Sequence, residues 1–186
     1  MYEIFKNDPK FIMAKSIFKT ERKENLKSRI KRFSFNLFPA YRGTGGRVCF
    51  ISSDYKEVHI KLGLNWRTKN YVGTVFGGSI YGALDPIYMT QLIKILGDEY
   101  IIWDKSATIK FVKPITKTVY ARFIISDELI EEIKSKVAKK KKLTIELNVA
   151  YQDEDGIIYA ESLKTLFIGN KSYFNDLMKK RTQQKI

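Results

Sequence analysis

Two adjacent glycines and an acid seven residues after them are the part of this sequence best suited to chemistry. Gly77 and Gly78 open a segment of helical periodicity, and Asp85 follows about two turns later. The first N–H groups of a helix have no partner within the helix, and glycine lets a ligand approach them closely. The helix start is also partly positive, so the pair predicts a site for a polarised carbonyl oxygen, as in an oxyanion hole.

The position of Asp85 admits more than one interpretation. It shares a helix face with Gly78, so its carboxylate could act on a carbonyl held at Gly78 or at the same glycine of a second copy. Alternatively, Asp85 caps a new helix that begins at Pro86. A third possibility is that Pro86 lies inside one helix and kinks it against the carbonyl of Gly82. For the glycine pair, the structural alternative is close helix packing.

One long helix and several strands must position these residues. Residues 77–96 form the helix, because apolar side chains recur on one face and cover most of its circumference. Period-two patterns predict strands at 48–51, 57–62, 101–112, 119–125, 143–151 and 157–168, with a short helix at 128–137. No βαβ spacing is visible. We therefore predict an α+β fold in which a curved antiparallel sheet of about six strands wraps a long central helix.

The segment around the glycines resembles the hotdog-fold thioesterases of the phenylacetyl-CoA type. The strings Val-Gly-Thr-Val-Phe-Gly-Gly at 72–78 and Trp-Asp-Lys at 103–105 are closest to an uncharacterised bacterial branch of them, and the resemblance covers roughly residues 45–168. In the catalytic family an Asn precedes the turn, a His-Gly-Gly follows, and an acid lies midway along the helix. Asn70, Gly77-Gly78 and Asp85 occupy these places.

The resemblance implies a hotdog fold and hydrolysis of an acyl-CoA or acyl-carrier-protein thioester at a homodimer interface, with a tetramer as the larger alternative. Asp85, Asn70 and Gly78 would be the catalytic residues. Coenzyme A would enter as part of the substrate, without a separate cofactor. The residues expected to contact the substrate are Phe76, Gly77, Tyr81, Tyr88, Met89, Lys110 and Lys113, the two lysines through phosphates or an acidic carrier.

Two departures from the family pattern support other functions. Phe76 replaces the family His, and Pro86 stands where a Thr or Ser is usual. The first alternative is therefore a non-catalytic acyl-CoA-binding protein. The second is a ligand-sensing regulator or adaptor that uses its basic N-terminal helices. The lone histidine, His59, is expected to pack or to face water, and it disfavours Ser-His-Asp chemistry and dehydratase chemistry.

The charge distribution bears on partners and on domain organisation. The net charge is +14, of which residues 1–47 contribute +8 and residues 171–186 contribute +4. We expect a basic helical extension at 1–40, a hotdog domain at 41–170 and a basic tail at 171–186. Because residues 48–170 are nearly neutral, we expect neither nucleic acid nor membrane as a partner.

The extension itself has two predicted helices. Asp8-Pro9 is typical of a helix start. In the second helix Leu26, Ile30, Phe33 and Leu37 share one face, which we expect to cover one end of the following domain, with membrane-surface binding as the alternative.

The remaining residue types set the expected environment. There is a single cysteine, Cys49, which excludes an internal disulfide. No His/Cys cluster has metal-ligand spacing, so no metal is expected. We predict a cytoplasmic protein, because the sequence shows no signal peptide and no apolar run of membrane-spanning length.

Overall fold

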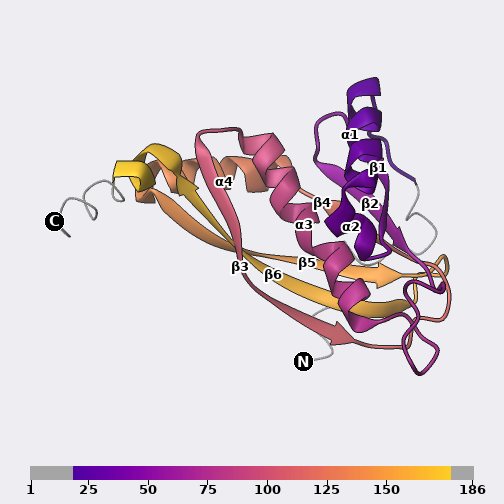
Figure 1. Ribbon diagram of the computed structural model, residues 1–186. Coiled ribbons are helices and arrows are strands. Elements are labelled where there is room, and N and C mark those ends of the chain that lie inside the picture. The colour runs from indigo at the N-terminus through magenta and orange to yellow at the C-terminus, as the bar shows by residue number, and fades with distance from the viewer. Residues whose placement is uncertain (1–18, 177–186) are drawn as a thin grey trace.

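The computed structural model describes residues 19–176 of the chain (Figure 1). Its labelled helices are α1 (Leu26–Leu37), α2 (Pro39–Gly43), α3 (Gly77–Leu96) and α4 (Asp127–Lys140), and residues 171–176 are also helical. Its strands are β1 (Arg47–Ile51), β2 (Glu57–Leu62), β3 (Tyr100–Phe111), β4 (Val119–Ile124), β5 (Lys142–Gln152) and β6 (Ile158–Asn170).

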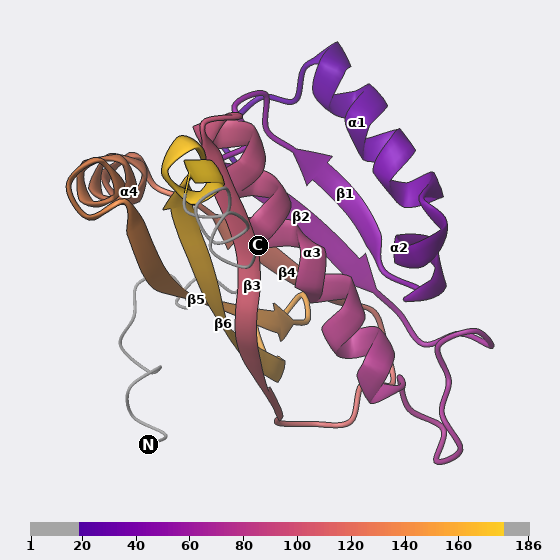
Figure 2. The ribbon, with the colours of Figure 1, turned by 60° about the vertical axis from the view of Figure 1, so that its left-hand side comes forward.

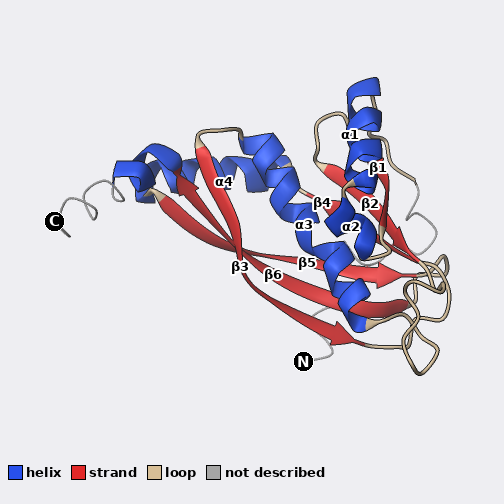
Figure 3. Ribbon diagram, in the orientation of Figure 1, coloured by secondary structure: helices blue, strands red, loops and turns tan. Residues whose placement is uncertain are grey.

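The strands form one six-stranded antiparallel sheet in the order β1-β2-β4-β5-β6-β3. The sheet curves beneath α3, which lies along its concave face (Figure 3). Leu84, Leu92, Phe123 and Leu166 belong to the completely buried core between helix and sheet. The predicted α+β fold, a long central helix on a six-stranded antiparallel sheet, is confirmed.

Helix α3 begins and ends where the sequence predicted, and it is continuous through Pro86. The interpretation of Asp85 as the cap of a new helix is therefore wrong. Proline lacks an N–H and removes one bond of the helical ladder. Leu84 and Ile87, on either side of Pro86 in the chain, are buried in the core and hold the helix against the sheet. The helix ends at Gly97, whose φ of 82° favours glycine.

Strand β3 contains a bulge that changes which of its side chains face the helix. The register with β6 shifts between Asp104 and Ser106. Before the bulge Asp104 pairs with the buried Leu166, and after it Ala107 pairs with the buried Lys164. Directly paired residues share a face. The period-two pattern at 101–112 therefore does not hold across the bulge, because a bulge inserts one extra residue.

Helix α1 lies beside β1, at the edge of the sheet opposite α4 (Figure 2). Its apolar face does not cover the domain as expected: Leu26, Ile30, Phe33 and Leu37 are 72%, 59%, 67% and 52% exposed. The opposite face packs inward, with Ser28 buried.

The reason for this orientation is that β1 is an edge strand whose backbone needs polar partners. The Asn36 amide donates to the carbonyl of Val48 and accepts from its N–H at 2.9 and 2.8 Å. The hydroxyl of Ser28 donates to the carbonyl of Ser52. Ser28 and Asn36, together with Phe35, therefore face the domain, and the apolar stripe faces outward.

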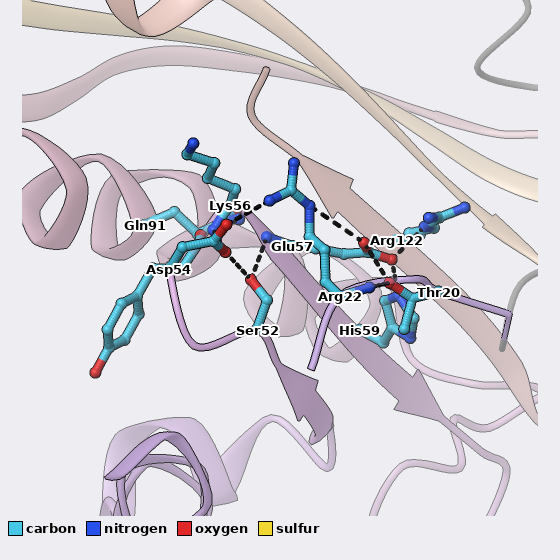
Figure 4. A network of polar contacts seen from close by, with 10 residues as sticks. Thr20, Arg22, Ser52, Asp54, Lys56, Glu57, His59, Gln91 and Arg122 are labelled. Atoms are coloured by element: carbon cyan, nitrogen blue, oxygen red, sulfur yellow. Dashed lines mark hydrogen bonds and ion pairs between the residues drawn. The ribbon is translucent and has the colours of Figure 1, made fainter. Parts of the chain in front are cut away.

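A polar network fixes residues 20–22 to the outer side of β2 (Figure 4). Glu57 is buried and accepts hydrogen bonds from Thr20 and Arg122, while the ring of His59 lies 2.6 Å from it. Burial alone would raise the pKa of Glu57, but the bonds from His59, Arg122 and Thr20 and the charge of Arg122 outweigh it and lower the pKa to about 2. His59 thus packs in a structural network, as expected.

Two further predictions concern the ends of the chain and membranes. The helix predicted after Asp8-Pro9 and most of the predicted basic tail lie outside the described residues. Within residues 19–176, no helix is both long and apolar enough to cross a membrane.

Candidate functional site

The start of α3 carries no side-chain cap. Phe76 is the N-cap residue, and its carbonyl accepts from the N–H of Ile80. Gly78 is exposed at this end. A Cβ at Gly78 would lie 2.3 Å from the ring of Phe76, and one at Gly77 would lie 3.2 Å from the ring of Phe111. The glycine pair therefore accommodates two aromatic rings, while its first helical N–H groups remain without intrahelical partners.

Asn70 organises the loop that leads to this helix start. Its Oδ1 accepts from the N–H groups of Val72 and Thr74, and its Nδ2 donates to the hydroxyl of Thr74 at 2.9 Å. Gly73 adopts a φ of 85° between them. The amide of Asn70 is thus engaged in closing the 70–74 turn, which fixes the direction in which α3 begins.

Asp85 is held on the side of α3 that faces β6 and β3. Its Oδ1 accepts from the hydroxyl of Tyr81 and from Nζ of Lys164, each at 2.7 Å. The same ammonium donates to the backbone carbonyl of Asp85 at 2.6 Å. The Asp85 side chain is nevertheless 43% exposed. It is therefore oriented by two donors and still reachable from outside the chain.

Lys164 is the residue that joins the helix to the sheet here. It is completely buried in β6, and its Nζ also donates to Oδ2 of Asp104 at 2.9 Å. A buried ammonium requires compensating charge, which the two carboxylates supply. Burial raises the pKa of the neighbouring Tyr81 hydroxyl, and its bond to Asp85 and the charges of Asp85 and Asp104 raise it further.

Lys164 was missed by the sequence analysis. It follows Ala160 and Ser162 and precedes Leu166 at every second position of a predicted strand, so it was detectable as a lysine in a core-facing row. The sequence did not say which of the two rows faced the helix. In the structure Asp104 pairs with Lys164.

The predicted site residues divide into those that share an open face and those that do not. Gly78, Tyr81, Asp85 and Met89 recur at helical spacing along one side of α3, and each is at least partly exposed. Tyr88 lies instead in the core, where its hydroxyl donates to the carbonyl of Asn148 at 2.7 Å. The structure thus places Tyr88 away from the row, because it faces the sheet.

The two predicted phosphate-binding lysines lie near the end of β3. Lys110 is exposed, with its Nζ 3.9 Å from Glu161 on the neighbouring strand. Lys113 is exposed just beyond the strand, and its backbone N–H donates to the carbonyl of Tyr159. Phe76, the residue in the place of the family His, is 58% exposed at the helix start.

Gly78 and Asp85 are too far apart within one chain to act on the same group. A rise of 1.5 Å per residue separates them by about 10 Å along the helix. Reacting groups must approach to about 3 Å.

Among the described residues, no cluster of His, Cys, Asp and Glu could hold a metal ion.

This fold places the chain in the hotdog class. A protein of unknown function from Pseudomonas aeruginosa, described as a probable thioesterase, superposes with a TM-score of 0.68 at 16% identity over 77% of this chain and 95% of its own. A thioesterase from Haemophilus influenzae gives a TM-score of 0.56 at 12% identity over 80% and 93%. A protein of unknown function from Chlorobaculum tepidum gives 0.62 at 15% identity over 77% and 93%.

Within that class, residues 27–168 match the family described as Domain of unknown function (DUF4442), and the chain belongs to this family. Among proteins with curated descriptions, none is significantly similar in sequence.

Proposed function

We propose that this protein hydrolyses acyl thioesters, with coenzyme A or an acyl carrier protein as the thiol, at a site between two copies of the chain. The observation that carries the proposal is the half-exposed Asp85, aligned on the open face of α3 with the exposed Gly78. Similar folds in proteins described as thioesterases support it.

Two features support a site between two copies: the distance between Gly78 and Asp85 within one chain, and the free edge of the sheet. Because Gly78 and Asp85 lie about 10 Å apart along one helix, the acid that serves Gly78 must come from elsewhere. Strand β3 is at the edge of the sheet, and most of its central residues are exposed. Pairing of β3 with its copy would cover this edge and bring the open faces of two α3 helices together.

In this site the acyl carbonyl oxygen would accept a hydrogen bond from the N–H of Gly78. Asp85 of the other copy would take a proton from water as the resulting hydroxide attacks the carbonyl carbon. The C–S bond then breaks, and the thiolate takes that proton back. As a nucleophile, Asp85 would instead attack the carbonyl carbon and expel the thiolate as the C–S bond breaks, which leaves a mixed anhydride. Water would then hydrolyse this anhydride to the free acid and the regenerated carboxylate, and the proton released would go to the thiolate. Among residues 19–176 both side-chain donors bind Oδ1, so Oδ2 is the oxygen assigned to either role.

The remaining residues would have supporting roles. Lys164 and Tyr81 position the carboxylate, and Asn70 positions the loop before the helix start. The acyl chain would lie along Tyr81 and Met89. Lys110 and Lys113 would contact the phosphates of coenzyme A or the acidic surface of a carrier protein.

The test is release of free thiol from acyl-CoA thioesters of short, long and aromatic acyl groups. Asp85→Asn should lower the rate by at least about 100-fold, because it removes the base while keeping the shape. Asp98→Asn, an exposed acid just beyond the end of α3, serves as the matched control and should keep the full rate. Equal rates in the Asp85→Asn variant and the unaltered protein would refute the assigned role.

A second candidate is a non-catalytic acyl-CoA-binding protein. The specific observation in its favour is that the Phe76 ring packs against Gly78, in the place of a polar family residue. This function predicts that acyl-CoA raises the melting temperature while no thiol is released.

A further inference from the structure

The outward apolar face of α1 is an unusual surface for a soluble domain. Four side chains at i, i+4, i+7 and i+11 form the stripe, and each is more than half exposed. Phe38, directly after the helix, extends it at 62% exposure. The stripe results from the way α1 docks, since Asn36 and Ser28 occupy the inner face. Contiguous exposed apolar patches mark interaction sites.

An arginine-lined groove of about 490 Å³ runs along the same helix. Phe33 and Leu37 belong both to the stripe and to the wall of the groove, so the two features are continuous. Among residues 19–176, no acidic residue lines the groove. Its arginines, which come from α1, α2, β1 and the loop after β2, are Arg32, Arg42, Arg47 and Arg67.

Most of this positive charge is uncompensated. Arg32 is paired with Glu24, but Arg42, Arg47 and Arg67 form no ion pair with any of residues 19–176. Guanidinium groups bind phosphate oxygens in a bidentate manner. Trp66, also on the groove wall, is 87% exposed, and the Arg67 guanidinium lies 5.6 Å from its ring centroid.

The stripe and the groove together distinguish among the partners that could bind this surface. A nucleic acid would satisfy the arginines and Trp66 but would leave Leu26 and Ile30 in water. A second copy would bring two positively charged surfaces together. A phospholipid surface supplies phosphates for the arginines and an apolar layer for the stripe, and tryptophan favours the boundary between them.

We propose that α1, together with the arginine-lined groove, is a docking surface for anionic phospholipid bilayers, on which the helix lies in the plane of the membrane. The basic residues on the flanks of the stripe, Lys27 and Lys31, lie where headgroups would be. This inference is independent of the thioesterase proposal, because the surface lies beside β1 and the candidate active site faces β6 and β3.

The experiment measures cosedimentation of the full chain with vesicles of phosphatidylcholine, alone or mixed with phosphatidylglycerol. Binding is expected to the mixed vesicles and should weaken strongly at about 1 M salt, where the screening length is about 3 Å. Equal binding to both kinds of vesicle would overturn the proposal.

Three variants separate the contributions. The triple variant Arg42→Gln, Arg47→Gln and Arg67→Gln should weaken binding by about 100-fold, since each basic residue near an anionic surface contributes about one kcal/mol. The double variant Ile30→Ser and Phe33→Ser should weaken it by at least about tenfold. The matched control, Lys134→Gln, Lys136→Gln and Lys139→Gln, removes the same charge from α4 and should retain nearly all of the binding.

Other occupants give distinct results. If the Ile30→Ser and Phe33→Ser variant lowers the melting temperature without vesicles, another part of the chain or a second copy covers the stripe, and the proposal fails. It also fails if RNA or coenzyme A competes fully with vesicles and binds independently of Phe33. An unchanged melting temperature together with lost vesicle binding supports it.

Discussion

At the scale of single residues, the candidate site is defined by one buried lysine. Lys164 places its ammonium between Asp85 on the helix and Asp104 on β3, which orients a carboxylate that is otherwise half exposed. The arrangement explains why an acid can project from the middle of a core helix. It also makes the position of Asp85 depend on the sheet.

Replacement of Lys164 tests this dependence. Lys164→Met should lower the free energy of unfolding by roughly 3 kcal/mol, because it removes the cation that compensates two carboxylates. Adding Asp104→Asn to that variant should restore part of the loss. Urea unfolding measures both. If Lys164→Met lowers the free energy of unfolding by less than about 1 kcal/mol, water already solvates Asp85 and Asp104, and the expected dependence on Lys164 is wrong.

Glu57 predicts a pH dependence of stability. Its pKa is about 2 in the folded protein, below the ordinary value of 4.5, so the unfolded chain takes up the proton first as pH falls. The stabilisation is therefore complete above about pH 4.5 and is lost as pH falls towards 2. Between these values the protein should lose on the order of 3 kcal/mol more than the Glu57→Gln variant. The expectation would be contradicted if the unfolding curves of the unaltered protein and of the Glu57→Gln variant shifted equally as the pH is lowered.

At the scale of elements, the orientation of α1 was the main difference from expectation. Amphipathicity predicted a helix at 26–37 correctly, but it assigned the apolar face to the core. The exposed backbone of an edge strand reversed this, since an asparagine side chain can satisfy both an N–H and a carbonyl of the strand. The spacing of apolar residues in the sequence gives no indication that an asparagine side chain will bond to a strand in this way.

Asn36 is therefore expected to anchor α1. Asn36→Ala should lower the free energy of unfolding by about 2 kcal/mol, because it leaves a donor and an acceptor of Val48 without partners. Hydrogen exchange at the Val48 N–H should accelerate in parallel. Arg29→Ala, an exposed change on the same helix, is the control and should leave both quantities nearly unchanged. Slow exchange at Val48 in the Asn36 variant would mean that α1 docks by other contacts.

At the scale of the whole molecule, the sheet ends in a long edge strand. β3 is twelve residues long, pairs with β6 on one side, and carries mostly exposed residues on its central part. A strand of this kind is a template for pairing with another chain.

Sedimentation equilibrium should therefore give twice the chain mass of 21.7 kDa. Dilution to monomer should accelerate hydrogen exchange at alternate residues of β3, which face the free edge. A monomer at all concentrations would remove the basis for a site shared between two copies.

The sequence by itself determined the elements and their class. The apolar helix at 77–96, the paired glycines, the acid two turns later and the alternating strands are local patterns, and local periodicity is preserved on folding. The family resemblance followed from the same segments.

Only the tertiary structure decided what these residues contact. The bulge in β3 fixed which of its side chains face the helix, and the register with β6 brought Lys164 beneath Asp85. The docking of α1 on an edge strand left its apolar stripe in solvent. Each of these depends on pairing between segments distant in sequence, and a one-residue change of register reverses which side chains are buried.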